Sequence, residues 1–445
     1  MVPMRALCAA TLILGFTTAA AIGDEAAVKG SASAIWGERA QGKTYKIAED
    51  VEMDGVHRKY VLETSAGKFP IVSDALMAVR LHEYAVVEQL NEDTGLGQFI
   101  QSFGSTALAP LKFGGQLIIS PVETAKQSAD GIGNFFDSLS SSSENKDSER
   151  GSFMGGVLGT DSARRELAAQ AQVDPYTDFP PLAKRLQELA AARGVGSLSL
   201  RGAMMAVPGG AALPSLTANT TRTVVFSASS VGTAQGLQEA LRTKTAGQIM
   251  RDCREKLTAL SGDAELVDSL LNNKNYTPAD LLVIAVALER IGAKDSSFFV
   301  RQSAGASDRT LAWLNRQQAE MYAGLKRSFG FDRFVARDGF VLMVLKDQRH
   351  LLAFPADLIY WTPKNRQDIS ALSASLAPEK PATKDGKPVA DKLMVITGDY
   401  SRMARAELAK LQWEPARMTI TAGLVSPPKP PAKPAAKPAA KPAAQ

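Results

Sequence analysis

The sequence is poor in the side chains that most enzymes use for catalysis. Its 445 residues include three histidines and two cysteines, and no two histidines have the spacing of metal ligands. The chain also lacks a G-x-S-x-G motif and a His-Glu-x-x-His motif. These absences argue against the common serine hydrolases and zinc proteases. We expect no cofactor and no metal.

The chain has little excess charge outside its two ends. It contains 51 basic and 46 acidic residues, and Arg5 with four tail lysines accounts for the whole difference. The body is therefore neutral and has no basic excess of the kind that specific nucleic-acid binding requires. The tail, Ser426–Gln445, is a Lys-Pro-Ala repeat without core-forming residues, so we expect an extended coil that binds polyanions weakly.

The N-terminus has the three parts of a signal peptide. Arg5 supplies positive charge, Ala6–Thr18 is apolar, and Ala19–Ala21 is a small-residue cleavage site. The apolar stretch is too short for a membrane-spanning helix. We therefore expect export to the periplasm or the extracellular space. Cleavage removes Cys8 and leaves Cys253 as the only cysteine, which excludes an intrachain disulfide.

Cys253 lies on an apolar stripe with Ile249 and Leu257, at the spacing of one face of a helix. A nucleophilic cysteine needs a partly open, electropositive environment. The stripe instead predicts a buried thiol that packs as a small apolar side chain.

The pattern of apolar residues predicts an α+β fold that is mainly α. Alternation with a period of two across 43–72 indicates a small β meander, and Ser73 is placed to cap a helix through Leu90. The predicted parts are a signal peptide at 1–21, a small α+β segment at 22–93, a glycine-rich helical region at 94–226, a helical bundle at 227–330, a mixed α/β domain at 331–425 and a disordered tail at 426–445.

Helix signals recur through the centre of the chain. Two helices, Thr160–Gln172 and Pro180–Ala192, are predicted around the turn dipeptide Asp174-Pro175. Thr277-Pro278 opens a helix that is apolar on every face and ends at Gly292, which predicts a helix buried all round. Ser307 is placed to cap another long helix through Arg327.

The part after residue 330 returns to strands. Turn signals divide 331–354 into three predicted strands, and Leu358–Trp361 is a candidate fourth. Leu393–Thr397, Tyr400–Leu411 and Met418–Thr421 then read as strand, helix and strand. That order predicts a βαβ unit or a helix packed across a mixed sheet.

The glycine-rich middle is unusually short of charge. Thr94–Val122 carries one charged residue and Gly202–Thr221 carries none. Internal prolines and glycines argue against a membrane-spanning helix. These segments could therefore contact a membrane but would not cross it. The helix predicted at 121–139 has an acidic excess, which favours packing of Phe136 inside the protein over insertion into lipid.

The loop between the strand at 393–397 and the following helix carries the best candidates for chemistry. Asp399 and Ser401 stand at the helix start, where backbone N–H groups could bind an anion. The two side chains could instead simply cap the helix, which we favour. His350 is the third candidate catalytic residue, whereas His57 and His82 are expected to be structural or solvated.

The block Val157–Ala190, with its VDPYTDFPP turn, resembles a motif of an uncharacterised family of exported bacterial proteins. Those proteins share a signal peptide, a short N-terminal β segment and a glycine-rich middle. The resemblance implies export and no particular activity.

These observations lead to one main hypothesis and two alternatives. The main hypothesis is an exported, non-enzymatic envelope protein that binds a partner protein or an envelope surface. The first alternative is a hydrolase whose site lies in the 331–425 domain. The second is a protein that interacts with membranes reversibly through its glycine-rich middle.

Overall fold

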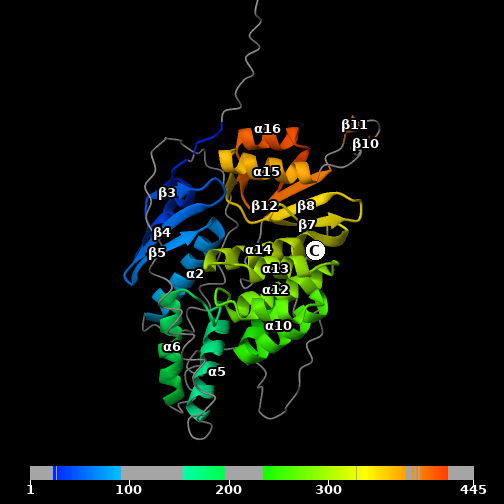
Figure 1. Ribbon diagram of the computed structural model, residues 1–445. Coiled ribbons are helices and arrows are strands. Elements are labelled where there is room, and N and C mark those ends of the chain that lie inside the picture. Colours follow the sequence, from blue (N-terminus) through cyan, green and yellow to red (C-terminus); the bar gives the residue numbers. More distant parts are fainter. Residues whose placement is uncertain are drawn as a thin grey trace, which may run out of the picture.

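The computed structural model describes residues 24–26, 28–91, 154–195, 234–326, 328–376, 383–384, 387–388 and 391–418. It confirms an α+β fold with an antiparallel N-terminal sheet, central helices and a C-terminal mixed sheet (Figure 1). The helix predicted at 121–139, both glycine-rich segments and the tail lie outside the described residues.

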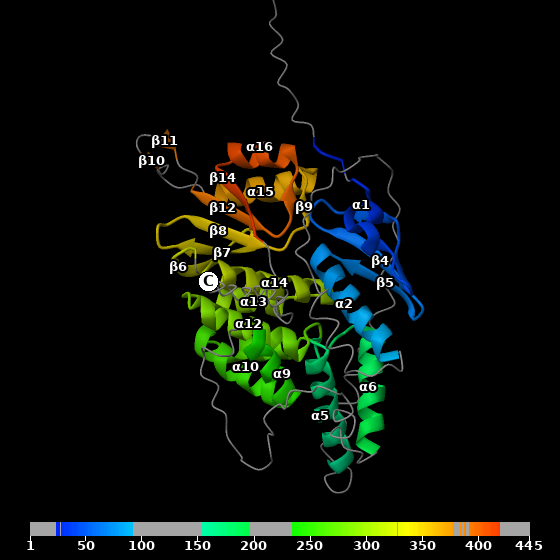
Figure 2. The same cartoon turned by 180° about the vertical axis from the view of Figure 1, so that it is seen from behind.

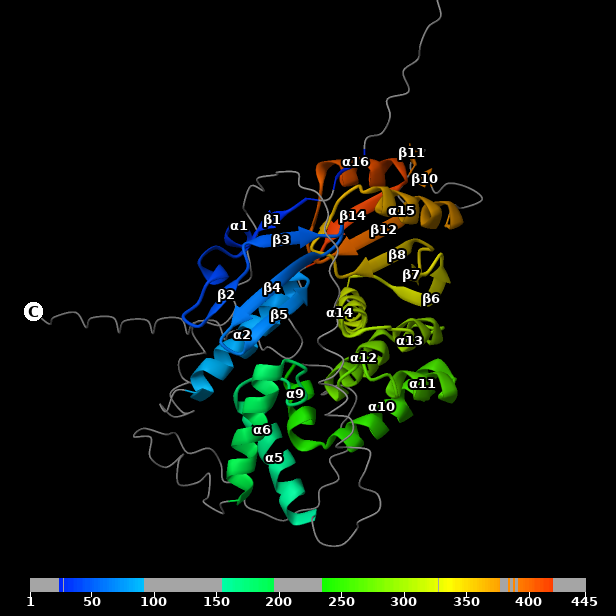
Figure 3. The ribbon, with the colours of Figure 1, turned by 60° about the vertical axis from the view of Figure 1, so that its left-hand side comes forward.

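The N-terminal unit is a sheet covered by one long helix. Its strands follow the order β1-β3-β4-β2, with β5 also on β4, and every pair is antiparallel. Buried side chains of the sheet and α2 form one core, and Figure 3 shows α2 lying against the strands. The elements are β1 (Gly30–Ser31), α1 (Ala32–Trp36), η1 (Gly37–Ala40), β2 (Tyr45–Ile47), β3 (Asp50–Met53), β4 (Arg58–Thr64), β5 (Gly67–Val72) and α2 (Asp74–Asn91).

The central part is helical. α5 and α6 form the predicted hairpin and pack against each other, and α6 also contacts α2. The helices are α5 (Met154–Gln170), α6 (Pro180–Val195), α9 (Ala234–Thr243), α10 (Ala246–Ser261), α11 (Ala264–Leu271), α12 (Pro278–Ile291), α13 (Ser297–Ala304) and α14 (Arg309–Leu325).

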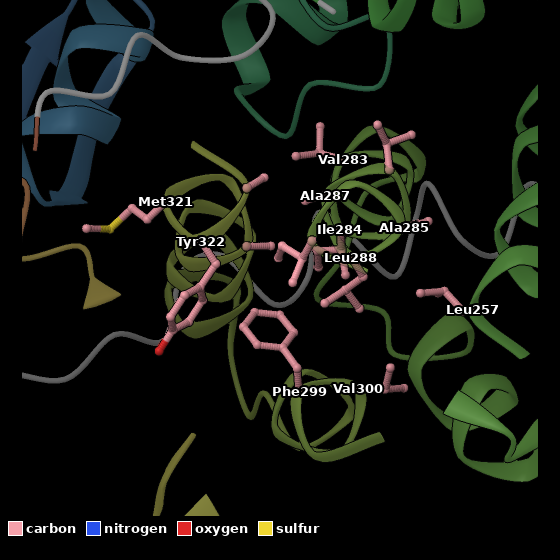
Figure 4. Close-up of a cluster of buried hydrophobic side chains, with 14 of the residues drawn as sticks. Leu257, Val283, Ile284, Ala285, Ala287, Leu288, Phe299, Val300, Met321 and Tyr322 are labelled. Carbon is pink, nitrogen blue, oxygen red and sulfur yellow. The ribbon is translucent and has the colours of Figure 1, made fainter. Parts of the chain in front are cut away.

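α12 is the centre of the helical bundle, as its sequence predicts. Thr277 and Asp280 form a capping box at its start, and Gly292 ends it in the left-handed conformation with φ 56°. Figure 4 shows α12 side chains packed between Tyr322 of α14 and Phe299 of α13. A helix with apolar residues on every face needs neighbours on all sides, and α10, α13 and α14 provide them.

Two helix starts differ from their sequence predictions. Thr160 does not cap α5, because the helix begins at Met154 and continues through Gly155 and Gly156 despite their low helix propensity. Asp308, one residue after the predicted Ser307, caps α14 by accepting a hydrogen bond from Leu311 N. A carboxylate at this position also interacts favourably with the helix dipole.

The C-terminal unit contains a mixed five-stranded sheet with the order β14-β12-β8-β7-β6. β12 runs parallel to β14 and to β8, so β12, α16 and β14 form the predicted βαβ unit. Its elements are β6 (Phe331–Arg337), β7 (Phe340–Leu345), β8 (His350–Phe354), β9 (Leu358–Ile359), α15 (Pro363–Ser375), β10 (Thr383–Lys384), β11 (Lys387–Pro388), β12 (Lys392–Ile396), β13 (Asp399–Tyr400), α16 (Arg402–Lys410) and β14 (Trp413–Arg417).

One strand prediction needs correction and another lies largely outside the described residues. A strand at Trp413–Arg417 is anchored by Trp413 in the core under α15 and α16, and of the strand predicted at Met418–Thr421 only Met418 is described. The candidate fourth strand, Leu358–Trp361, does not join the main sheet. Only Leu358–Ile359 is a strand, and it pairs with β13.

The C-terminal sheet is the middle of three layers (Figures 1 and 2). Val341 and Met343 of β7 face the helical bundle, whereas Leu342 between them faces the core under α15 and α16. This arrangement explains why β7 is apolar at consecutive positions, since a strand covered on both faces has no solvent side.

Cys253 is buried in the bundle core with 1% of its surface exposed. Burial, with a smaller contribution from Asp252, raises the pKa of its thiol to about 12.

Thiol reagents should therefore label the native protein slowly and the denatured protein fast, as followed by mass spectrometry. Cys253→Ala should cost about 1–2 kcal/mol of unfolding free energy. Cys253→Ser should cost more, because it buries a hydroxyl. Fast labelling of the native protein would contradict this.

Candidate functional site

The three residues predicted to carry chemistry do not meet. His350 is the first residue of β8 and pairs with Lys392, whereas Asp399 and Ser401 follow Ile396 at the other end of the sheet. Four residues of extended strand separate the two ends by about 13 Å. Burial lowers the pKa of His350, with Lys392 and Arg337 adding to the effect and Asp391 opposing it.

Ser401 is the N-cap of α16, since its hydroxyl accepts a hydrogen bond from Ala404 N at 2.9 Å. The same hydroxyl donates to Glu25 Oε2 at 2.5 Å, and Trp361 N donates to this carboxylate at 2.6 Å. Both hydrogen bonds of this hydroxyl are made inside the protein, one to the start of α16 and one to the Glu25 carboxylate. The geometry matches the capping interpretation of this residue.

Asp399 pairs with two arginines at the surface, Arg405 and Arg417. Burial alone would raise its pKa, but hydrogen bonds from Tyr400 N and Arg405, together with the charge of Arg417, lower it. A carboxylate stabilised in its ionised form is a poor proton donor near neutral pH.

The N-terminal unit covers the carboxyl-terminal edge of the parallel strands, where open α/β sheets usually bind ligands. Asp357, in the loop after β8, accepts hydrogen bonds from Arg58 N at 2.8 Å and Asp74 N at 2.9 Å. His57 contributes a further contact, with its Nε2 lying 2.9 Å from Pro355 O. A Cβ added at Gly398 would lie 1.9 Å from Asp357 O, so only glycine fits this approach.

Asp74 and Asp357 form a buried pair of carboxyl groups at this junction. Burial, followed by repulsion from Asp74, raises the pKa of Asp357 well above its usual range. Burial also raises the pKa of Asp74, although Arg58 opposes the shift, and Tyr60 donates a hydrogen bond to the same carboxyl group. Because backbone N–H groups of Arg58 and Asp74 donate to Asp357, the pair acts as a structural clamp between the two units.

A second buried cluster joins α2, the α5–α6 loop, α12 and α14, and we call it the central ion network. Arg309 donates to Asp178 at 2.9 Å and to Asp280 at 2.6 Å. Arg80 donates to Asp178 and to Glu83, each at 2.6 Å. The network consists of Arg80, Glu83, Asp178, Asp280, Arg309 and Arg316.

The charges of the central ion network depend on one another. Burial would raise the pKa of Asp178, but Arg309 and Arg80 outweigh it and hold this pKa below its usual range. Asp174, in the same loop, accepts a hydrogen bond from Tyr176 N at 2.7 Å. Burial and repulsion from Asp280 raise the pKa of Asp174 to about 7. The sequence predicts only a turn in this loop, and it does not predict that Asp174 and Asp178 join a buried ion network.

A groove of about 560 Å³ lies between the β4–β5 turn, α2 and α6. We call it the α2–α6 groove. Its volume falls in the range of small-molecule sites, roughly 300–1,000 Å³. It is lined by Lys43, Thr44, Ser65, Ala66, Tyr84, Ala85, Val87, Glu88, Gln89, Asn91, Pro181, Lys184, Arg185 and Glu188.

Hydroxyl groups gather at one place in the α2–α6 groove. Tyr84 Oη lies 3.3 Å from Ser65 Oγ and from Thr44 Oγ1, and it donates to Thr44 O at 3.2 Å. Glu88 accepts a hydrogen bond from Thr44 Oγ1. The Ser65-Ala66 turn that closes this side is recognisable in the sequence, but its approach to α6 depends on tertiary packing.

Within the described ranges, no three His, Cys, Asp or Glu side chains form a metal-binding group, and no helix there is long and apolar enough to cross a bilayer. Comparisons with protein-family models, curated proteins and solved structures find no match to this chain. The candidate site therefore depends on geometry alone.

Proposed function

We propose that this protein is an exported, non-enzymatic envelope protein that binds its partner or surface through the α2–α6 groove. The observation that carries the proposal is the groove itself, a polar hollow of ligand size with hydroxyl and charged side chains along it. Its charged groups lie on α2, on α6 and at Lys43 before β2. Such a lining suits recognition of a polar ligand.

The hydrolase alternative has less support. Ser401 caps a helix and hydrogen-bonds Glu25, Asp399 pairs with arginines, and His350 lies at the opposite end of the sheet. Acyl transfer by Ser401 with His350 as its base would need these two side chains within hydrogen-bond distance, about 2.6–3.2 Å. The membrane alternative involves segments outside the described residues.

Filling the α2–α6 groove should abolish binding to the envelope. Ala66 is an exposed turn residue on the groove lining, so Ala66→Trp adds a large side chain there with little effect on the core. We expect the mature protein to co-sediment with isolated cell-envelope fractions and Ala66→Trp to lose at least about 90% of this binding, equivalent to about 1.4 kcal/mol.

Ala264→Trp is the matched control, because Ala264 is exposed at the first position of α11 and lies outside the groove. It should bind as the unmodified protein does, and both variants should keep the same melting temperature. Equal binding by Ala66→Trp, or hydrolysis of ester, phosphate or peptide substrates that Ser401→Ala removes, would contradict the proposal.

A further inference from the structure

We infer that the ligand of the α2–α6 groove is a short acidic saccharide, a chain of sugar units that carry carboxylates. This inference rests on the proposed function and specifies its ligand. It follows from three properties of the groove: a cluster of hydroxyl groups, a mixed charge with a small cationic excess, and a size suited to a small polar molecule.

The hydroxyl cluster provides groups that both donate and accept hydrogen bonds. Tyr84 is 2% exposed, so its phenol ring is fixed by packing while its hydroxyl joins Thr44 and Ser65 at the groove. Ser65 is exposed at the turn and its hydroxyl can rotate. Tyr84 already donates to Thr44 O, and Thr44 Oγ1 donates to Glu88. The cluster therefore offers a sugar hydroxyl the rotatable Ser65 hydroxyl as donor and oxygen lone pairs as acceptors.

The charges on the lining favour a ligand with few negative charges. Lys43, Lys184 and Arg185 outnumber Glu88 and Glu188. Glu188 pairs with both cations of α6, at 3.4 Å from Arg185 and 4.0 Å from Lys184, so the lining has a net excess of one positive charge. The two carboxylates would repel a densely charged polyphosphate or nucleic acid, whereas a single carboxylate per sugar unit matches the cationic excess.

Lys184 is the cation best placed to meet such a carboxylate. Its side chain is 78% exposed at the groove rim, and its contact with Glu188 is long. Arg185 differs, because its guanidinium donates to Leu90 O at the end of α2 at 2.5 Å and so ties α6 to α2. Removing Lys184 therefore tests ligand recognition, whereas removing Arg185 would also disturb the packing of the two helices.

The test uses the mature full chain and digalacturonate as the acidic probe, with cellobiose as a neutral disaccharide of similar size. Isothermal titration calorimetry should detect digalacturonate, with at least about tenfold weaker binding of cellobiose. Lys184→Glu should weaken digalacturonate binding at least about tenfold, a ratio equivalent to 1.4 kcal/mol. Raising the salt concentration should weaken it further, as expected for an exposed charge contact.

Lys364→Glu is the matched control. Lys364 is 81% exposed near the start of α15 and pairs with an acid four residues later, as Lys184 does, but it lies outside the groove. This variant should bind digalacturonate normally. The inference is overturned if digalacturonate does not bind, if cellobiose binds equally, or if the two lysine variants weaken binding equally. Envelope binding that Ala66→Trp abolishes, without digalacturonate binding, would overturn the ligand class and leave the proposed function intact.

Discussion

Replacing Arg309 by methionine should lower the free energy of unfolding by about 3 kcal/mol. Arg309 bridges Asp178 and Asp280, and Asp280 is completely buried. Removing one member of a buried ion pair leaves its partner as a buried charge that has lost part of its compensation. The cost lies at the lower end of the usual range, because Arg80 still faces Asp178 and Arg316 still faces Asp280. Chemical denaturation at pH 7 measures the change.

The matched control for Arg309 is Arg254, which also makes two hydrogen bonds to an aspartate, Asp268, at 2.6 and 2.8 Å. This pair is on the surface, with the Arg254 side chain 52% exposed. Exposed ion pairs contribute about 1 kcal/mol or less, so Arg254→Met should have a small effect. Equal effects of the two substitutions would show that the central ion network does not hold the units together.

Asp174→Asn should raise the free energy of unfolding by about 2–4 kcal/mol more at pH 8 than at pH 4. The folded-state pKa of about 7 exceeds the value of about 3.9 expected for an unfolded aspartate. The folded protein therefore binds this proton more tightly. The resulting stabilisation is full below about pH 4 and is lost as the pH rises through 7.

Asparagine removes this loss because it does not ionise, and its amide oxygen can still accept the hydrogen bond from Tyr176 N. The charged groups that act on Asp174 are Asp280, Arg316 and Glu83, and the substitution leaves them in place. Denaturation curves across pH 4–8 give the profile for each protein. Parallel profiles would show that Asp174 does not hold a proton at neutral pH.

Local signals predicted much of the fold because they act within a few residues. Thr277-Pro278 and Gly292 mark both ends of α12 through hydrogen bonds and backbone angles that neighbouring residues determine. The same type of signal, Thr362-Pro363, begins α15, which was overlooked because its polar composition obscured the buried Ile369. The Thr-Pro pair that opens α12 is the same signal, so comparing the two pairs is enough to predict α15.

The sites depended on tertiary contacts and were harder to predict. Asp178 is 98 residues from Arg80 and 131 from Arg309 in the sequence, so no spacing rule joins them. The α2–α6 groove likewise forms where a hairpin turn meets a helix more than a hundred residues later. The candidates at Asp399 and Ser401 came from their position at a helix start that follows a strand, where backbone N–H groups could bind an anion. Here the N-terminal unit covers that position.

Hydrogen–deuterium exchange of the mature protein, with and without envelope extract, tests the central claim most directly. If the protein binds through the α2–α6 groove, amides in the Ser65-Ala66 turn and the first turns of α6 should exchange more slowly in the presence of the extract. The loop from Gly398 to Ser401 should be unaffected. Slower exchange in that loop, with no change at the turn and α6, would contradict the account and favour a site in the C-terminal unit.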